Sequence, residues 1–388
     1  MRPRTILSLI LPFAALFALG DASAAGRAEP VAIGLSFLTN IAFAPDGRLF
    51  FAEKDSGDIR VIQDGRLQPD PFAHVDVLSS SEQGLLGLAL DPSFATDPWV
   101  YVYYSDPVAT INRLARLRAD GTRIVRQPLL DALTTEHGYH NGGDIVFGAD
   151  QKLYLSLGEV HESARAQDPD DLGGKVLRLN ADGTVPDDNP FGAANPVYSM
   201  GHRNSFGLCI DPATGDLWET ENGPGSDDEL NLIEPGGNYG WPDQLGPGGA
   251  PRYVDPVLDF PTPIVPTGCA VWRGDLYFGA YATGLLYRVP LPAGSDAQAF
   301  VMRNMGAGVT DLEVGPDAAL YVATSDAIWR FATPPGEGTP VPETVPTPVP
   351  PSGGAGVVIV IAAGALLAAG LAARLIAGRR LRRDASER

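Results

Sequence analysis

One histidine in a glycine-rich stretch is the clearest candidate for acid–base chemistry in this chain. His140 begins the stretch His140–Asp144, which reads HNGGD. An imidazole titrates near neutral pH, so it can take a proton from a hydroxyl group under physiological conditions. A histidine can also brace a loop through a hydrogen bond to the backbone, and the residues alone favour that simpler role. Whether His140 is a base therefore depends on its neighbours.

Three other stretches gather polar and acidic side chains between short apolar runs. They are Ser81–Gly87 (SEQGLLG), Gly201–Asn204 (GHRN) and Glu221–Asn231 (ENGPGSDDELN), and the last runs on to Gly237–Pro242 (GNYGWP). Carboxylates and backbone carbonyls are the hard oxygen ligands that calcium prefers. An arginine such as Arg203 can stabilise negative charge that develops in a reaction. The acidic run can also be a solvated turn, and the arginine can belong to a structural ion pair.

The sequence excludes several common classes of protein. It contains no G-x-S-x-G, no phosphate-binding G-x-x-x-x-G-K and no H-E-x-x-H motif. The formal net charge is −19, from 28 basic and 47 acidic residues. Because nucleic-acid binding depends on neutralising phosphates with basic side chains, this charge argues against a nucleic-acid partner.

A repeated pattern indicates the elements that would position these residues. Six times, a turn rich in Asp, Pro and Gly leads into a short strand that alternates aromatic and aliphatic residues. These strands are expected at 49–52, 99–103, 153–156, 217–218, 276–278 and 320–322. Such alternation between turns predicts β-hairpins, and repetition at a period of about 40 to 65 residues is typical of propellers. We predict an all-β, six-bladed β-propeller, with a β-sandwich as the alternative. The polar loops would then meet at one mouth of its central channel.

The two ends of the chain differ from the body. Residues 1–25 have a basic start, an apolar run and a small-residue cleavage motif, as in a secretory signal peptide. Residues 27–331 form the folded body, and the proline-rich residues 333–354 predict an extended linker. Residues 355–373 carry no charge and are long enough for a transmembrane helix, whose cytoplasmic side the arginines in 374–388 would mark. A cleaved sorting tail is the alternative. We therefore expect export to the periplasm or cell surface, with a C-terminal anchor in the cytoplasmic membrane.

The chain has two cysteines, Cys209 and Cys269. Export would permit a disulfide between them. Both lie among apolar residues, however, so we expect buried free thiols rather than a bridge.

Three of the polar blocks together resemble the glucose/sorbosone dehydrogenases. These blocks are HNGG at His140–Gly143, GHRN at Gly201–Asn204 and GPxxDDExN at Gly223–Asn231. The family includes the soluble quinoprotein glucose dehydrogenase and the periplasmic aldose sugar dehydrogenase, and the likeness covers about residues 33–331. It implies a six-bladed propeller, in agreement with the repeats. It also implies oxidation of a sugar or other small-molecule substrate with pyrroloquinoline quinone (PQQ) and calcium.

The resemblance further implies roles for single residues around the quinone. His140 matches the base that takes the proton of a sugar's anomeric hydroxyl. Arg203 and Asn204 match a pair that contacts PQQ. A glutamine that meets the cofactor aligns with Glu82, and Gln83 is its neighbour.

Two calcium sites are implied in the same way. Gly223 and Pro224 match residues whose backbone carbonyls hold the calcium that bridges to PQQ. Glu229 and Tyr239 match a separate calcium site, to which Tyr239 would contribute its carbonyl.

The sequence also departs from the family where the quinone's three carboxylates need cations. A lysine of PQQ-binding members is replaced at Ala282–Thr283, and two arginines are missing from Gly308–Asp311. Arg288 and Arg303 are nearby in the sequence and could substitute. A carboxylate at Glu82 would repel an anionic cofactor.

Two functions therefore remain open. The first is an extracytoplasmic sugar (aldose) or aldehyde oxidoreductase, which the intact His140, Arg203 and Asn204 favour. The second is a non-catalytic, calcium-stabilised propeller that binds a carbohydrate or protein at the cell surface, which the missing cations favour. The hedgehog-interacting proteins, which act by binding, resemble this family too.

Overall fold

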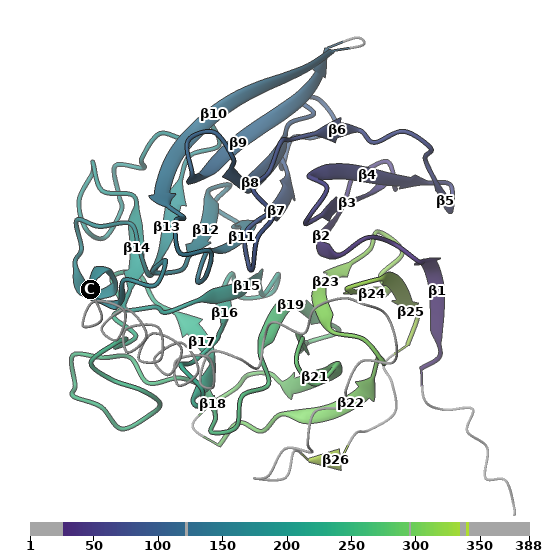
Figure 1. Cartoon of the computed structure of the whole chain (residues 1–388). Helices are drawn as coiled ribbons and strands as arrows, with labels where there is room; N and C mark the ends of the chain where they lie inside the picture. Colours follow the sequence, from purple (N-terminus) through teal and green to yellow (C-terminus); the bar gives the residue numbers. More distant parts are fainter. Residues whose placement is uncertain (1–25, 121–122, 295, 334–338, 341–388) are drawn as a thin grey trace, which may run out of the picture.

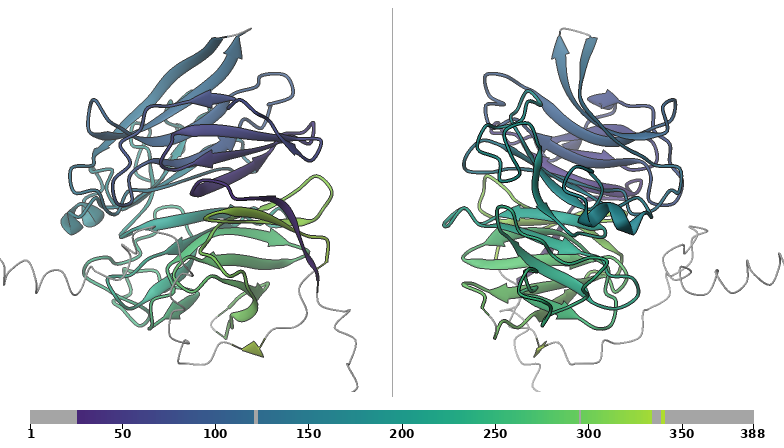
Figure 2. Two further views of the ribbon diagram at one scale, coloured as in Figure 1. Left: turned by 45° about the vertical axis from the view of Figure 1, so that its right-hand side comes forward. Right: turned by 90° about the vertical axis from the view of Figure 1, so that its left-hand side faces the viewer.

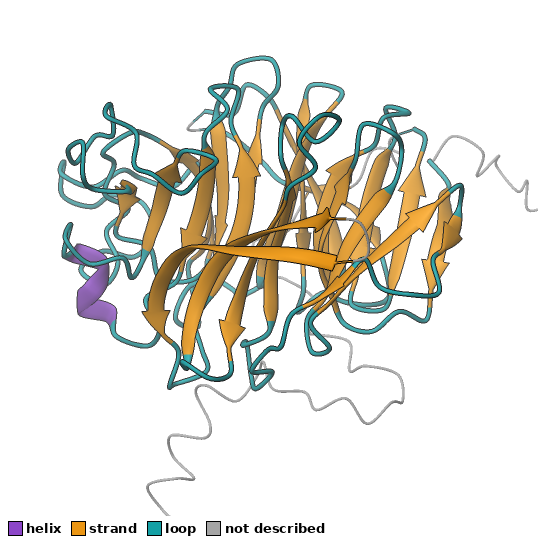
Figure 3. Cartoon of the chain, turned by 90° about the horizontal axis from the view of Figure 1, so that it is seen from above, coloured by secondary structure: helices purple, strands orange, loops and turns teal. Residues whose placement is uncertain are grey.

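Six antiparallel sheets surround a central axis like the blades of a propeller (Figure 1). The computed structural model describes residues 26–120, 123–294, 296–333 and 339–340. The prediction of an all-β, six-bladed propeller is confirmed. In every blade the first strand lies nearest the axis, and the strands run between two faces that carry the loops (Figure 3).

The strands follow one another blade by blade. Blade 1 contains β2 (Leu38–Phe43), β3 (Leu49–Glu53), β4 (Asp58–Gln63) and β5 (Arg66–Leu67), with β6 (Ala73–His74) paired to β4. Blade 2 contains β7 (Leu85–Leu90), β8 (Val100–Asp106), β9 (Ile111–Asp120) and β10 (Arg123–Thr134). Blade 3 contains β11 (Gly142–Phe147), β12 (Leu153–Leu157), β13 (Lys175–Leu179) and β14 (Val197–Met200), with the short 3₁₀ helix η1 (Ser163–Gln167) before β13.

The remaining blades complete the ring. Blade 4 contains β15 (Ser205–Ile210), β16 (Leu217–Glu221), β17 (Asp228–Ile233) and β18 (Leu258–Phe260). Blade 5 contains β19 (Pro266–Trp272), β20 (Asp275–Ala280), β21 (Leu285–Pro290) and β22 (Phe300–Asn304), to which β26 (Thr339–Pro340) is added. Blade 6 contains β23 (Val309–Val314), β24 (Leu320–Thr324), β25 (Ala327–Phe331) and β1 (Ala28–Ile33). The β9–β10 hairpin extends beyond the other blades (Figure 2).

The six repeats found in the sequence are the second strands of the six blades: β3, β8, β12, β16, β20 and β24. Most of their side chains are buried on both faces, because each blade packs against two neighbours. Aspartates of the preceding turns accept hydrogen bonds from tyrosines of these strands and so fix the turns to them. Tyr101 donates a hydrogen bond to Asp91 over 2.9 Å, and Tyr154 donates one to Asp150 over 3.1 Å.

Strands from opposite ends of the body close the ring. β1 pairs with β25, and Ala28 lies opposite Phe331. Blade 6 is therefore built from residues about 300 positions apart in the chain. Backbone hydrogen bonds and an ion pair between Glu29 and Arg330 over 3.0 Å hold the two ends together. This closure leaves no blade without a neighbour on either side.

Aspartates and glycines join the innermost strands to one another. The Asp144 carboxylate accepts the Leu208 N–H of blade 4 over 2.7 Å, and Asp311 accepts the Ile41 N–H of blade 1 over 2.8 Å. Gly87 packs so tightly against blade 3 that an added Cβ would lie 2.0 Å from the Gly143 carbonyl oxygen. The third position of these strands thus sets how closely neighbouring blades approach.

The two cysteines form a disulfide, so the prediction of free thiols is wrong. Cys209 on β15 and Cys269 on β19 have their Cα atoms 5.6 Å apart, within the usual range for a bridge. The bond links the innermost strands of blades 4 and 5. The apolar neighbours of both cysteines reflect burial between blades, which is compatible with either state of the thiols.

The predicted terminal segments lie almost wholly outside the described residues. This applies to the signal peptide (1–25), the membrane span (355–373), the basic tail (374–388) and all but three residues of the linker. Within the described part of the chain, no helix combines the length and apolar character needed to cross a bilayer.

Candidate functional site

The polar loops singled out in the sequence meet at one end of the propeller axis. The first strand of each blade starts at this end, and the turn between its second and third strands returns to it. Glu82, His140 and Arg203 lie in loops of the first kind, and Glu159 and Asn222 in turns of the second kind. We call the group formed by Glu82, His140, Glu159 and Arg203 the mouth.

His140 is held at both ring nitrogens. Its Nδ1 lies 2.7 Å from Glu159 Oε1, and its Nε2 lies 2.9 Å from Arg203 Nη2. A guanidinium can only donate, so Nε2 accepts and Nδ1–H donates to the carboxylate. The imidazole is therefore neutral, in a fixed orientation, with its basic nitrogen turned toward Arg203. The ring is buried, and its backbone has a φ of 55°, in the left-handed region.

Glu159 is a site residue that the sequence reasoning missed. It is 2% exposed, and its second oxygen, Oε2, has no hydrogen-bond partner among the described residues. The sequence held a signal for it: Glu159 lies three residues after the strand predicted at 153–156, and the turns after such strands reach the mouth. A nearby carboxylate stabilises the charge that His140 would acquire on taking a proton.

Arg203 links the mouth to the loop that follows β16. Its Nη1 donates to the carbonyl oxygens of Asn222 and Gly223, both over 2.8 Å, and its backbone N–H donates to the Glu221 carboxylate. The guanidinium lies 5.4 Å from the centre of the Trp241 ring. Burial lowers the pKa of Arg203, but a guanidinium stays protonated in proteins. The Arg203 guanidinium thus contacts His140, the Trp241 ring and the carbonyls of the loop after β16.

Of the neighbours Glu82 and Gln83, the structure brings Glu82 to the mouth. Its Oε2 accepts the His140 backbone N–H over 2.7 Å and the Asn204 side-chain amide over 3.2 Å. Gln83 is buried and donates to the hydroxyl of Thr135 over 3.0 Å. Glu82 therefore supports the left-handed backbone of His140 and adds negative charge beside it.

The acidic run after Gly223 is largely buried. Asp228 is 1% exposed and accepts the backbone N–H groups of Gly223, Ile264 and Val265 over 2.7 to 2.8 Å. The interpretation of this run as a solvated turn is thus wrong for Asp228, which fixes the loop. Pro224 is exposed, and the Gly223 carbonyl already accepts from Arg203.

The cations that the quinone's carboxylates would need are not replaced by the arginines nearby in the sequence. Arg288 on β21 lies 3.5 Å from Asp275, and Arg303 lies over the ring of Phe331. Both belong to the outer half of blade 5. Lys54, in the β3–β4 turn at the mouth end of blade 1, pairs with Asp55 over 2.8 Å.

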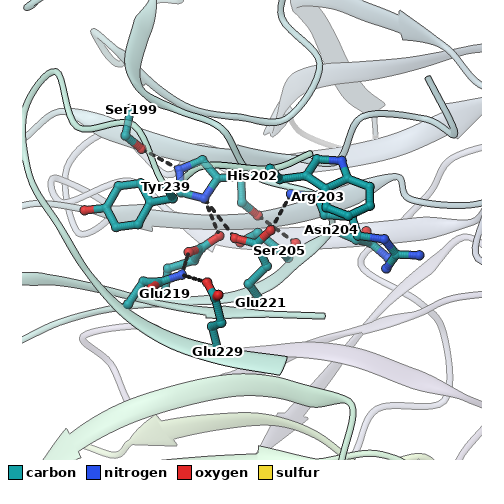
Figure 4. Close-up of polar contacts among 12 residues, drawn as sticks. Ser199, His202, Arg203, Asn204, Ser205, Glu219, Glu221, Glu229 and Tyr239 are labelled. Atoms are coloured by element: carbon teal, nitrogen blue, oxygen red, sulfur yellow. Dashed lines mark hydrogen bonds and ion pairs between the residues drawn. The ribbon is translucent and has the colours of Figure 1, made fainter. Parts of the chain in front are cut away.

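A second group of polar residues lies beside the mouth, between blades 3 and 4 (Figure 4). His202 is fully buried, with Nδ1 3.1 Å from Glu219 Oε1 and 3.0 Å from Glu221 Oε2. Asn231 donates to Glu219 over 3.0 Å and to Glu229 over 3.2 Å. We call these five residues the buried acidic cluster.

The pKa values in this cluster reflect its crowding of carboxylates. Burial, together with the charges of Glu221 and Glu219, raises the pKa of Glu229 to about 9. Burial alone would lower the pKa of His202, but Glu219 and Glu221 outweigh it and raise the value to about 10. The buried carboxylates of this cluster have few positive charges nearby, so a bound cation would stabilise them.

The structure brings the predicted calcium ligands Glu229 and Tyr239 into this same region. The Tyr239 ring stacks on His202 with the ring centres 4.8 Å apart, and Glu229 Oε1 accepts the Gly246 N–H over 3.1 Å. Carboxylate and carbonyl oxygens in a negatively charged surrounding suit calcium. The buried Glu229 carboxylate therefore suits the cation that the resemblance implies there.

Comparison with known proteins agrees with this geometry. Residues 35–330 match the family model described as glucose/sorbosone dehydrogenase. The aldose sugar dehydrogenase of Escherichia coli is 29% identical over 74% of this chain and 86% of its own length.

Two solved structures have the same fold. One is a Thermus thermophilus protein assigned as a glucose dehydrogenase, with 41% identity, a TM-score of 0.74, and coverage of 79% of this chain and 99% of that one. The other is the PQQ-bound aldose sugar dehydrogenase of Streptomyces coelicolor, with 34% identity, a TM-score of 0.72, and coverage of 79% and 97%. The chain therefore belongs to the glucose/sorbosone dehydrogenase family.

Proposed function

We propose that this protein is an extracytoplasmic oxidoreductase that acts on aldoses or related aldehydes, with His140 as its general base. The observation that carries the proposal is the fixed state of His140. Its Nδ1–H faces the Glu159 carboxylate and its Nε2 accepts a hydrogen bond from Arg203, so Nε2 is the nitrogen that carries no proton. A base needs this state before it meets a substrate hydroxyl.

In this proposal Arg203 and Asn204 would hold the quinone, and the backbone carbonyls of Gly223 and Pro224 would hold calcium. PQQ, when bound, would accept the hydride that leaves the substrate carbon. His140 Nε2 would take the proton of the substrate hydroxyl, and Glu159 would stabilise the resulting imidazolium. Arg203 now donates to Nε2, so this hydrogen bond must be released before the base can act.

The proposal is tested by titrating the purified full-length protein with PQQ and calcium and following the quinone absorbance. Loaded protein is then given aldoses and a redox dye. We expect dye reduction that falls about 100-fold or more in His140→Ala, because the proton acceptor is lost. His74→Ala is the matched control, since His74 is exposed on blade 1 and pairs only with Asp58 and Asp76.

A second function, a non-catalytic propeller that binds a carbohydrate or protein, has its own support. Glu82 brings a carboxylate to the mouth, and Arg203 is already engaged by Asn222 and Gly223. We expect Ala282→Lys combined with Thr310→Arg to tighten quinone binding if the enzyme proposal holds. Failure of both the natural protein and this variant to bind PQQ would leave the binding function alone.

A further inference from the structure

The imidazole of His202 faces two carboxylates with the same nitrogen. Its Nδ1 lies 3.1 Å from Glu219 Oε1 and 3.0 Å from Glu221 Oε2. His202 and Glu219 are 0% exposed, and Glu221 is 5% exposed. These three ligand atoms lie within 4.8 Å of one another. The three residues thus form a preformed, solvent-free set of donor atoms.

A single N–H cannot satisfy both carboxylates. In the structure Nδ1 makes its hydrogen bond to Glu221, and Glu219 Oε1 has no hydrogen-bond partner among the described residues. A buried carboxylate oxygen that accepts no hydrogen bond destabilises the folded state. The hydrogen bond of Nδ1 thus goes to Glu221, and Glu219 meets the imidazole as an ion pair at 3.1 Å.

Two further buried oxygen atoms in this region also lack a hydrogen-bond partner within the described residues. Ser205 Oγ and Asn231 Oδ1 belong to fully buried residues and make no hydrogen bond within the described part of the chain. Figure 4 shows Ser205 beside the carboxylates of the cluster. Burial would raise the pKa of Glu219, whereas His202, Asn231 and Ser205 lower it, so all three lie close to this carboxylate. Three polar side chains thus lie against the Glu219 carboxylate.

The charges of the clustered side chains also favour a bound cation. Glu219 and Glu221 face His202, and Glu229 is joined to Glu219 through the neutral amide of Asn231. One imidazolium cannot balance Glu219 and Glu221 when both are ionised. A divalent cation on a neutral imidazole would balance Glu219 and Glu221 completely.

We propose that His202, Glu219 and Glu221 bind a divalent metal ion of the zinc class. Zinc lies about 2.0–2.2 Å from nitrogen and oxygen ligands, so tetrahedral ligands are about 3.3–3.5 Å apart. The separations of 3.0 and 3.1 Å from Nδ1 need to widen by only a few tenths of an ångström. The imidazole nitrogen selects zinc over calcium, which takes oxygen ligands.

The other ring nitrogen of His202 has the partner that a metal ligand needs. Nε2 lies 2.8 Å from the hydroxyl oxygen of Ser199. When Nε2–H donates to this hydroxyl, the Nδ1 lone pair points at the two carboxylates. Metal-binding histidines are oriented by such a hydrogen bond in the same way.

The site is a structural centre that positions Arg203. Glu221 uses Oε2 toward His202 and its other oxygen, Oε1, to accept the Arg203 backbone N–H. A metal at the first oxygen would fix the second and hold the loop before β15. Because all three ligands are buried, substrate cannot reach the ion. This inference does not depend on the proposed oxidoreductase activity.

The first test is elemental analysis of the full-length protein, purified without chelators after exposure to zinc. We expect about one zinc per chain, and cobalt substituted for it should give the visible absorption of a tetrahedral centre. Glu219→Gln keeps the shape of the side chain and should lose the zinc. Glu229→Gln is the matched control: it should keep the zinc and lose calcium-dependent stability.

The second test applies to the unaltered protein and so does not depend on whether a variant folds. Nitrogen NMR of ¹⁵N-histidine-labelled protein should show His202 with Nε2 protonated and Nδ1 bound to metal. Both nitrogens protonated, together with no stoichiometric zinc, would overturn the proposal and make the cluster an ion pair. Zinc that Glu219→Gln retains in folded protein would equally exclude this site.

Discussion

At the scale of single residues, the geometry of the mouth depends on two acidic side chains. Glu82 holds the backbone of His140, and Glu159 holds its ring. Neither needs to touch a substrate to matter. They set which nitrogen is protonated and where it points, and these are the two properties that a general base requires.

We predict that Glu159→Gln lowers turnover by roughly 100-fold or more while leaving substrate binding nearly unchanged. A glutamine keeps the hydrogen bond to Nδ1 but cannot neutralise the imidazolium formed during proton transfer. The measurement is kcat and KM in the dye-reduction assay. A rise in KM with unchanged kcat would mean that Glu159 does not support the base.

At the scale of the elements, hydrogen bonds between innermost strands hold the blades in register. Asp144 receives the N–H of Leu208 from the next blade and the amide of Asn40 from across the axis. Burial raises its pKa to about 6, although these hydrogen bonds oppose the rise. The same carboxylate therefore joins three blades and resists ionisation.

This raised pKa gives a prediction of pH dependence. Between about pH 4 and pH 6 the folded state keeps a proton on Asp144 that the unfolded state has lost. Stability should therefore fall as the pH rises through this window, by up to ~3 kcal/mol. Denaturant unfolding at pH 4 to 7 should show the fall, and a slope equally steep in Asp144→Asn would assign it to another group.

The disulfide is the covalent counterpart of these contacts. It closes a loop over a sequence separation of 60 residues between blades 4 and 5. By the chain-entropy argument, its removal should cost about 2–4 kcal/mol of unfolding free energy. Urea unfolding of the Cys209→Ala, Cys269→Ala double variant measures this cost. An unchanged midpoint would mean that blade packing alone holds these strands together.

At the scale of the whole molecule, the closed propeller lies between a predicted signal peptide and a predicted membrane anchor. The signal peptide at 1–25 and the arginines of 374–388 remain predictions from the sequence. Together they predict that the mouth lies outside the cytoplasm, where sugars and periplasmic electron acceptors would reach it. Localisation and catalysis are therefore linked in the proposed function.

We predict that protease added to intact cells releases the propeller by cutting the proline-rich linker at 333–354. Extended proline-rich chain is accessible to proteases, whereas the closed ring of blades is not. Immunoblotting of cells and supernatant measures the release. A body that is cut only after lysis would contradict an outward-facing propeller.

The sequence by itself determined the fold class, because the evidence for it is local and repeated. Each Asp/Pro/Gly turn is followed by an alternating strand, and six copies add up to six blades. The same holds for the loops that carry His140 and Arg203. Each lies just before the first strand of a blade. Because the first strand of every blade starts at the same end of the axis, that position brings a loop to the mouth.

Only the tertiary structure decided which side chains meet. Glu82 and Gln83 are adjacent in sequence, and the backbone turns one toward His140 and the other toward Thr135. Cys209 and Cys269 meet because blades 4 and 5 are neighbours. Glu159 meets His140, and Glu219 on β16 meets His202, because segments from separate parts of the chain converge there. Contacts between blades depend on the angle and register of whole sheets, and no local pattern in the chain encodes these.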